Sequence, residues 1–207
     1  MAYPILKIIV LPLVKLLIKE VKGIENIPKK GPFIVTSNHS SFLDPLLLGY
    51  YIIKKTNQKI HFIAYRGRFA FLGKFIIKKW LGVILLRYNK KEISVALEEA
   101  VSILKKEGIV GIFLAPEPNY SLAKPKTGIA RIALDAKCPV LPVILRGVKE
   151  STFPHSIILR RIRHASVIYK KPLVFKKTGK NIKSVANKIA RVILLGLKQN
   201  ENMHSLR

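Results

Sequence analysis

The stretch FIVTSNHSSFLDP, residues 33–45, decides how this chain is interpreted. Its apolar and β-branched start, residues 33–36, predicts a short strand, and the polar residues after it predict a turn. An apolar segment from Leu46 onward predicts a helix. Within the turn, His39 and Asp44 lie five positions apart. Histidine has the unperturbed pKa closest to neutral, and a carboxylate bonded to one ring nitrogen fixes which other nitrogen accepts a proton. The spacing therefore predicts a general-base pair at the start of a helix.

The same turn also fits a purely structural interpretation. Ser41-x-x-Asp44 matches a helix capping box, with Ser41 as the N-cap and Asp44 three residues later. His39 would then be an ordinary loop residue. The two interpretations are compatible, because a helix N-terminus presents free N–H groups and a positive dipole end that suit an oxyanion or a phosphate. The rest of the chain has to decide between them.

Length and composition predict one domain with an unusual charge. The chain has 207 residues, 49% of them apolar, and no linker rich in proline, glycine or serine divides it. Lysine and arginine number 38 against 11 acidic residues, which gives a net charge of +27. A solvated lysine surface explains such a charge, and so does a polyanionic partner: nucleic acid, anionic lipid, a phosphorylated substrate or an acidic carrier protein. Charge alone slightly favours nucleic acid. The single cysteine, Cys138, excludes an internal disulfide and a cysteine-based metal site, and it is expected in the core.

The N-terminal sequence PILKIIVLPLVKLLI, residues 4–18, predicts an amphipathic helix. It is too short and too charged for a comfortable membrane span. On a helical wheel Lys7, Lys15 and Lys19 fall in one sector, and Pro12 predicts a kink. A broad apolar face with a lysine stripe suits a helix that lies among lipid headgroups, although a helix packed on the core is the alternative. The chain is accordingly divided into a membrane-associating helix, residues 1–20, and one domain, residues 21–207.

Strand and helix patterns alternate along the rest of the chain. Alternation of this kind predicts an α/β fold, a single-domain mixed, largely parallel sheet flanked by helices. Strands are expected at residues 33–36, 60–64, 82–86, 109–114, 140–145 and 165–169, and helices at residues 72–81, 92–107 (with Gly108 as C-cap), 128–136 and 182–197.

Two blocks resemble a known family, the 1-acylglycerol-3-phosphate O-acyltransferases and related glycerolipid acyltransferases. The resemblance covers residues 21–174. VKGIENIPKKGPFIVTSNHSSFLDP, residues 21–45, resembles the family's opening, where a short strand leads into Asn-His and an aspartate follows five residues after the histidine. WLGVILLRYN, residues 80–89, is similar to its second motif, one residue shortened. This similarity implies that Arg87 contacts the acceptor's phosphate, which suits the two parallel hydrogen bonds of a guanidinium.

The third block departs from the family pattern. The family carries Pro-Glu-Gly-Thr-Arg-Ser where this chain has PEPNYS, residues 116–121. Glu117 and Ser121 stand in place, whereas Pro118 replaces the glycine and Tyr120 replaces the arginine. A phosphate-binding charge is therefore missing from its usual position.

Two explanations of this departure stay open. Lys124 or Lys126 supplies the missing charge as a point charge, without bidentate geometry. Alternatively, the acceptor's headgroup is not a simple phosphomonoester, and Tyr120 stacks on a sugar or lines an apolar wall. A fourth block, PVLPVIL at residues 139–145, looks like the family's last motif and is expected to line the acyl side of the site.

The resemblance implies a glycerol-3-phosphate acyltransferase-like fold and a reaction. A fatty acyl group would pass from a thioester donor, acyl-CoA or acyl carrier protein, to a hydroxyl of a lysophospholipid or related glycerolipid. His39 would act as the general base, oriented by Asp44, with Asn38 among the substrate-binding residues. Ser40 and Ser41 are better explained as capping residues than as nucleophiles, because the family transfers the acyl group directly. No metal and no cofactor beyond the donor is expected.

Partners and location follow from the same resemblance. The basic surface fits an anionic membrane, coenzyme A phosphates or an acidic acyl carrier protein better than nucleic acid, because no recognisable nucleic-acid-binding motif is present. We expect a peripheral or monotopic protein on the cytoplasmic face of a membrane. The alternatives are the same fold acting on a different lipid acceptor, and a non-catalytic basic protein that binds lipid or nucleic acid.

Overall fold

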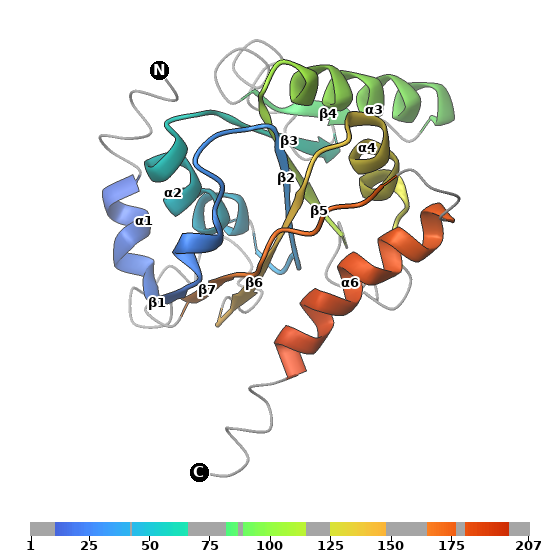
Figure 1. The fold of residues 1–207 in the computed structure, drawn as a ribbon. Helices are drawn as coiled ribbons and strands as arrows, with labels where there is room; N and C mark the ends of the chain where they lie inside the picture. The colour runs from blue at the N-terminus through green and yellow to red at the C-terminus, as the bar shows by residue number, and fades with distance from the viewer. Residues whose placement is uncertain are drawn as a thin grey trace.

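A seven-stranded sheet forms the centre of the molecule in the computed structural model, which describes residues 11–41, 43–65, 82–86, 89–114, 125–147, 165–176 and 181–198 (Figure 1). The strand order across the sheet is β1-β7-β6-β2-β5-β3-β4. The strands are β1 (Ile18–Lys22), β2 (Phe33–Ser37), β3 (Ile60–Tyr65), β4 (Ile84–Leu86), β5 (Ile109–Phe113), β6 (Val140–Arg146) and β7 (Ala165–Tyr169).

Strand directions place the His39 turn at the carboxyl ends of the parallel strands. β2, β3, β4, β5 and β6 run parallel to one another, β7 runs antiparallel to β6, and β1 runs parallel to β7. The prediction of a mixed, largely parallel sheet is therefore confirmed. β2 lies between β5 and β6, and the His39 turn follows its carboxyl end. In open α/β sheets, ligands bind beyond the carboxyl ends of the strands.

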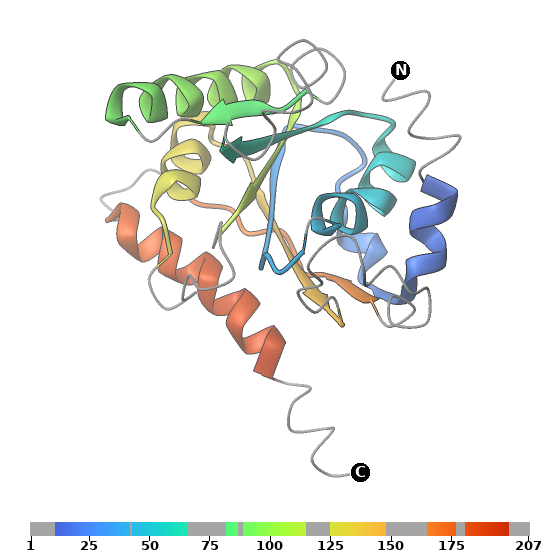
Figure 2. The same ribbon diagram turned by 180° about the vertical axis from the view of Figure 1, so that it is seen from behind.

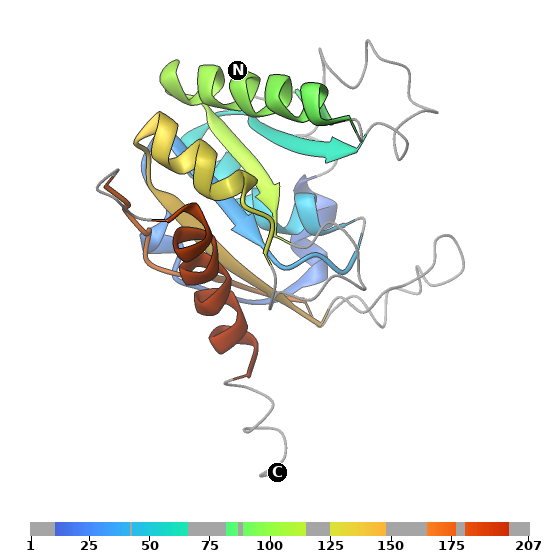
Figure 3. The same cartoon turned by 90° about the vertical axis from the view of Figure 1, so that its right-hand side faces the viewer.

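Helices cover both faces of the sheet. α1 (Leu11–Leu17) and α2 (Asp44–Thr56) lie on one face, and α3 (Lys90–Lys105), α4 (Gly128–Ala136) and α6 (Ile182–Lys198) lie on the other (Figures 1 and 2). A short 3-10 helix, η2 (Ile24–Asn26), follows β1. Seen from the side, α3, α4 and α6 stack in a single layer beside the strands (Figure 3).

The burial of β2 explains the apolar run at residues 33–35, with which the strand begins. All five of its residues are buried, as expected of a central strand in a sheet that is covered on both faces. Phe33 and Val35 belong to the hydrophobic core beneath α1 and α2, whereas Ile34 belongs to the core beneath α3, α4 and α6. β2 thus packs into both cores, and this packing fixes the point from which the His39 turn starts.

The structure corrects several expected boundaries: the strand expected at residues 82–86 is Ile84–Leu86, and the helix expected at residues 92–107 is Lys90–Lys105. The N-terminal helix ends at Leu17, and residues 18–20, which we assigned to it, begin strand β1. At the end of α3, the residue in the left-handed region is Glu107 (φ 59°) rather than Gly108. The N–H of Gly108 donates to the carbonyl of Ile103 at 3.0 Å. Gly108 is therefore the residue after the left-handed position, which Glu107 occupies. The helix expected at residues 72–81 lies outside the described residues.

Candidate active site

Asn38 fixes the start of the turn to the neighbouring strand. Its side-chain Nδ2 donates to the carbonyl of Leu145 at 2.8 Å, and its Oδ1 accepts the N–H of Leu145 at 3.0 Å. These two bonds continue the β2–β6 ladder by one step with a side chain. Oδ1 also accepts from the hydroxyl of Ser37 at 3.2 Å. Because both ends of the amide are engaged within the protein, Asn38 acts here as a positioning residue, and its contact with a substrate stays a prediction.

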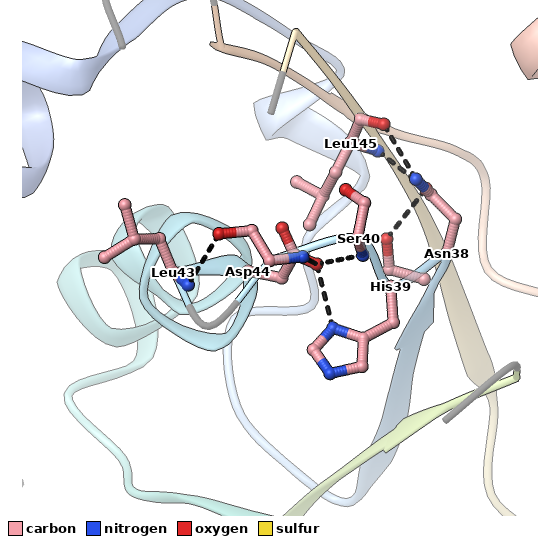
Figure 4. A network of polar contacts seen from close by, with 8 residues as sticks. Asn38, His39, Ser40, Leu43, Asp44 and Leu145 are labelled. Carbon is pink, nitrogen blue, oxygen red and sulfur yellow. Dashed lines mark hydrogen bonds and ion pairs between the residues drawn. The ribbon is translucent and has the colours of Figure 1, made fainter. Parts of the chain in front are cut away.

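Three donors converge on one oxygen of Asp44 (Figure 4). His39 Nδ1 lies 2.8 Å from Asp44 Oδ2, and the backbone N–H groups of Ser40 and Ser41 donate to the same oxygen at 2.6 and 2.8 Å. The Asp44 side chain is 0% exposed and the His39 side chain 16% exposed. A carboxylate that is buried away from water is costly unless it accepts hydrogen bonds, and these three donors supply them. The turn therefore holds the carboxylate in one place, and the carboxylate holds the imidazole.

The orientation of the imidazole follows from this contact. Oδ2 accepts from two N–H groups, so Asp44 acts as the acceptor and Nδ1 of His39 acts as the donor. In the neutral ring Nε2 then carries the lone pair. Within the described part of the chain, Nε2 has no hydrogen-bond partner. The arrangement can take a proton at Nε2 and stabilise the resulting cation through Asp44.

The capping prediction is half right. Asp44 reaches back to the N–H of Ser41, as the acidic residue of a capping box does. However, α2 begins at Asp44 itself and Leu43 is its N-cap residue, so Ser41 lies too far out to cap it. The Ser41 hydroxyl instead accepts the N–H of Leu43 at 3.2 Å. Both serines thus shape the turn.

Sequence reasoning missed Phe113, at the end of β5. Its ring stacks on the imidazole of His39, with centroids 4.3 Å apart and planes 18° apart. Register explains the contact: Phe113 pairs with Ser37, the last residue of β2, and His39 lies two residues beyond Ser37 in the turn. Nothing local to the turn could have revealed a partner on another strand.

The structure brings together part of the predicted site. Asn38, His39 and Asp44 form one network. Lys126 is exposed just ahead of α4, and its contact with a substrate stays a prediction. The other predicted residues lie outside the described residues, namely Arg87, Glu117, Tyr120, Ser121 and Lys124.

His61 provides a contrast to His39. Its Nδ1 lies 2.9 Å from the carbonyl of Gly82, not from a carboxylate, and burial lowers the pKa of His61. Because burial disfavours the charged ring, His61 suits a structural role between β3 and β4. The remaining histidines, at positions 155, 164 and 204, lie outside the described residues.

Two kinds of feature are not found among the described residues. Among the described residues, no group of three or more histidine, cysteine, aspartate or glutamate side chains is arranged to hold a metal ion. Likewise, none of the helices in the described ranges has the length and apolar character needed to cross a bilayer.

The fold resembles a solved enzyme structure. The crystal structure of the 1-acyl-sn-glycerophosphate (LPA) acyltransferase PlsC from Thermotoga maritima matches with a TM-score of 0.66 at 24% identity. The match covers 93% of this chain and 80% of that one. At this identity the similarity establishes the α/β fold alone.

Curated relatives match the central part of the sequence. A 1-acyl-sn-glycerol-3-phosphate acyltransferase of Bacillus subtilis is 26% identical over 129 residues, which is 59% of this chain and 60% of that protein. The mouse 1-acyl-sn-glycerol-3-phosphate acyltransferase alpha is 29% identical over 63% of this chain. The match spans 46% of the mouse protein, so the chain spans about half to three fifths of the curated relatives it matches.

The family model described as Acyltransferase matches residues 19–146, which include the His39 turn and extend from β1 to the end of β6. That range is well over half of the chain, and it contains β2 and the two strands beside it, β5 and β6. On this match the chain belongs to the Acyltransferase family.

Proposed function

We propose that this protein is an O-acyltransferase that moves a fatty acyl group from a thioester donor to a hydroxyl of a glycerolipid. The observation that carries the proposal is the 2.8 Å contact between His39 Nδ1 and Asp44 Oδ2 in a chain of the Acyltransferase family. The contact leaves Nε2 available as a base at the carboxyl edge of the sheet. Acyl transfer to an alcohol needs a base there, because a neutral hydroxyl is a weak nucleophile.

The reaction proceeds in two steps through His39. The acceptor's hydroxyl oxygen attacks the thioester carbonyl carbon while the hydroxyl proton passes to Nε2 of His39. The carbon–sulfur bond then breaks, and the leaving thiolate takes the proton back from the imidazolium. The products are an ester and a free thiol. Asp44 keeps the ring in place and stabilises its cationic form between the two steps.

The acceptor is a lysophospholipid or a related glycerolipid. The curated relatives are named for 1-acyl-sn-glycerol-3-phosphate, which makes lysophosphatidate the first acceptor to test. PEPNYS at residues 116–121, which lacks the arginine of the family pattern, favours a second candidate, an acceptor with a different headgroup. The donor is acyl-CoA or acyl carrier protein, and both are polyanions that suit a chain of net charge +27.

The protein reaches its lipid substrates as a peripheral membrane protein. On α1, Val14 is buried in the core beneath α2, whereas Leu13 and Leu16 are each 58% exposed. Lys15 and Lys19 are exposed beside them. Exposed leucines flanked by lysines suit insertion among anionic headgroups.

A donor-by-acceptor activity matrix in mixed micelles tests the function. Acyl-CoA and acyl carrier protein donors are each combined with lysophosphatidate, lysophosphatidylcholine and a glycolipid acceptor, and thiol release is followed. Cys138 will not disturb this readout, because it is buried and burial raises the pKa of its thiol to about 11. Release that depends on an acceptor supports the proposal, and lysophosphatidate as the best acceptor excludes the second candidate. Absence of release with every pair contradicts the proposal.

A further inference from the structure

The imidazole of His39 lies at the end of a row of three aromatic rings. The ring of Phe113 stacks on His39 at a centroid distance of 4.3 Å, and the ring of Phe62 stacks on Phe113 at 5.8 Å with planes 10° apart. The rings come from the turn after β2, from β5 and from β3, which are neighbours in the sheet. The row therefore crosses three strands on the face that carries α2.

A glycine makes room for this row. Phe62 pairs with Gly111 across β3 and β5. A Cβ at position 111 would approach two carbons of the Phe62 ring to 2.4 Å, well inside any normal contact. Because position 111 has no side chain, the Phe62 ring lies flat over β5, nearly parallel to Phe113. Gly111 and Phe113 share this face, since they are two residues apart in one strand.

The stack supplies a restraint that Asp44 does not. A hydrogen bond to Nδ1 fixes one atom of the imidazole, but the ring can still pivot about that bond. A phenyl ring packed on one face of the imidazole fixes its plane. Together the two contacts determine where Nε2 points. The face of Phe113 also lies within the distance, about 6 Å, at which an aromatic ring attracts a cation.

We propose that Phe113 is a positioning residue for the reaction, holding the plane of the His39 imidazole so that Nε2 faces the acceptor hydroxyl. The expected effect on kcat rests on the proposed function, whereas the contact between the Phe113 and His39 rings does not depend on it. Phe62, which pairs with Gly111, stacks beside Phe113 and helps to hold its ring in place. Small errors in the position of a catalytic group cost about 10²-fold in rate, so loss of the ring should lower kcat substantially.

Phe113→Leu, Phe113→Tyr and Phe113→Trp test the kinetic consequence. Leucine keeps an apolar side chain but removes the flat ring, so kcat is expected to fall about 10- to 100-fold with KM little changed. Tyrosine and tryptophan restore a ring, so kcat should recover. Phe175→Leu is the matched control, because Phe175 is a buried phenylalanine in the core on the opposite face of the sheet. Wild-type kcat in Phe113→Leu, or the same loss in the tyrosine and tryptophan variants, overturns the inference.

Proton NMR of the His39 ring tests the geometry without any substrate. A phenyl ring 4.3 Å away shifts the ring protons of the imidazole upfield, and Phe113→Leu should move them downfield. The His39→Gln spectrum identifies these resonances. Unchanged shifts in Phe113→Leu refute the positioning role even if the wild-type enzyme is active. A wild-type protein that transfers no acyl group, but shows the expected shift, refutes the proposed function instead.

Discussion

The side-chain amide of Asn38 binds both backbone polar groups of Leu145, 107 residues later in the chain, at 2.8 and 3.0 Å. This pair of bonds ties the His39 turn to β6. The position of the turn therefore depends on Asn38, to which the proposed mechanism gives no part in proton transfer.

Asn38→Ala should therefore lower both stability and activity. The substitution leaves the N–H and carbonyl of Leu145 without their partner, which costs about 1–3 kcal/mol in the free energy of unfolding. It also releases the backbone next to His39, so kcat should fall. Denaturant unfolding and steady-state kinetics measure the two effects. Asn26→Ala is the matched control, because the Asn26 amide donates to the Tyr169 carbonyl on β7, two strands away from β2, and its loss should lower stability alone. Wild-type kcat in Asn38→Ala would contradict the positioning role.

Asp44→Asn tests the orientation of the imidazole. The amide has the size of the carboxylate, but it places an NH₂ group where three donors converge and cannot stabilise an imidazolium ion. We expect kcat to fall by about 10²-fold or more. Asp135→Asn removes the same charge from the exposed face of α4 and should retain activity. Equal kcat values in Asp44→Asn and wild type would rule out this role for Asp44.

Leu13→Asp combined with Leu16→Asp tests membrane contact through α1. The exposed leucines lose the apolar area that inserts among headgroups, so binding to anionic vesicles should weaken by about tenfold or more. Vesicle co-sedimentation measures this binding. Leu195→Asp is the control, because Leu195 is similarly exposed but lies on α6, across the sheet. If the control weakens binding as much as the double variant, α1 is not the contact.

The lowered pKa of His61 predicts that the free energy of unfolding depends on pH. Burial lowers the pKa of His61 below its ordinary value of 6.5, so the folded protein favours the neutral ring. As the pH falls below about 6.5 the unfolded chain takes up this proton first, and stability is lost until the folded pKa is passed. His61→Gln has no such proton. The difference in unfolding free energy between wild type and His61→Gln should therefore shift against the wild type between about pH 7 and 5. A difference that is constant over this range would show that the folded protein does not discriminate against protonated His61.

Local patterns predicted most of the sheet and its helices. α4 and β7 have the boundaries that periodicity indicates, residues 128–136 and 165–169. β1 was missed because Ile18–Lys22 follows α1 directly, with no glycine or proline between them to signal a change. These residues form a strand because they pair with β7, which lies more than 140 residues later in the chain and cannot be inferred from the local sequence.

In the candidate site too, contacts between residues close in sequence were predicted, and contacts between different strands were not. The His39–Asp44 contact joins residues five apart, so their spacing, together with the family resemblance of the residues around them, predicted it. The contacts of His39 with Phe113 and of Asn38 with Leu145 depend on strand register, which the local sequence does not specify. One signal was present: Gly111 stands inside a strand two residues before Phe113, and an isolated glycine in a strand indicates close approach of another group.

Acyl transfer by His39→Gln measures the central claim most directly. With the best donor and acceptor pair, we expect kcat/KM to fall by about 10²- to 10⁴-fold while the unfolding transition stays close to that of the wild type. His61→Gln, which replaces a histidine outside the network, should retain activity at neutral pH. Transfer by His39→Gln at the wild-type rate would contradict the account, because the reaction would then need no base at Nε2.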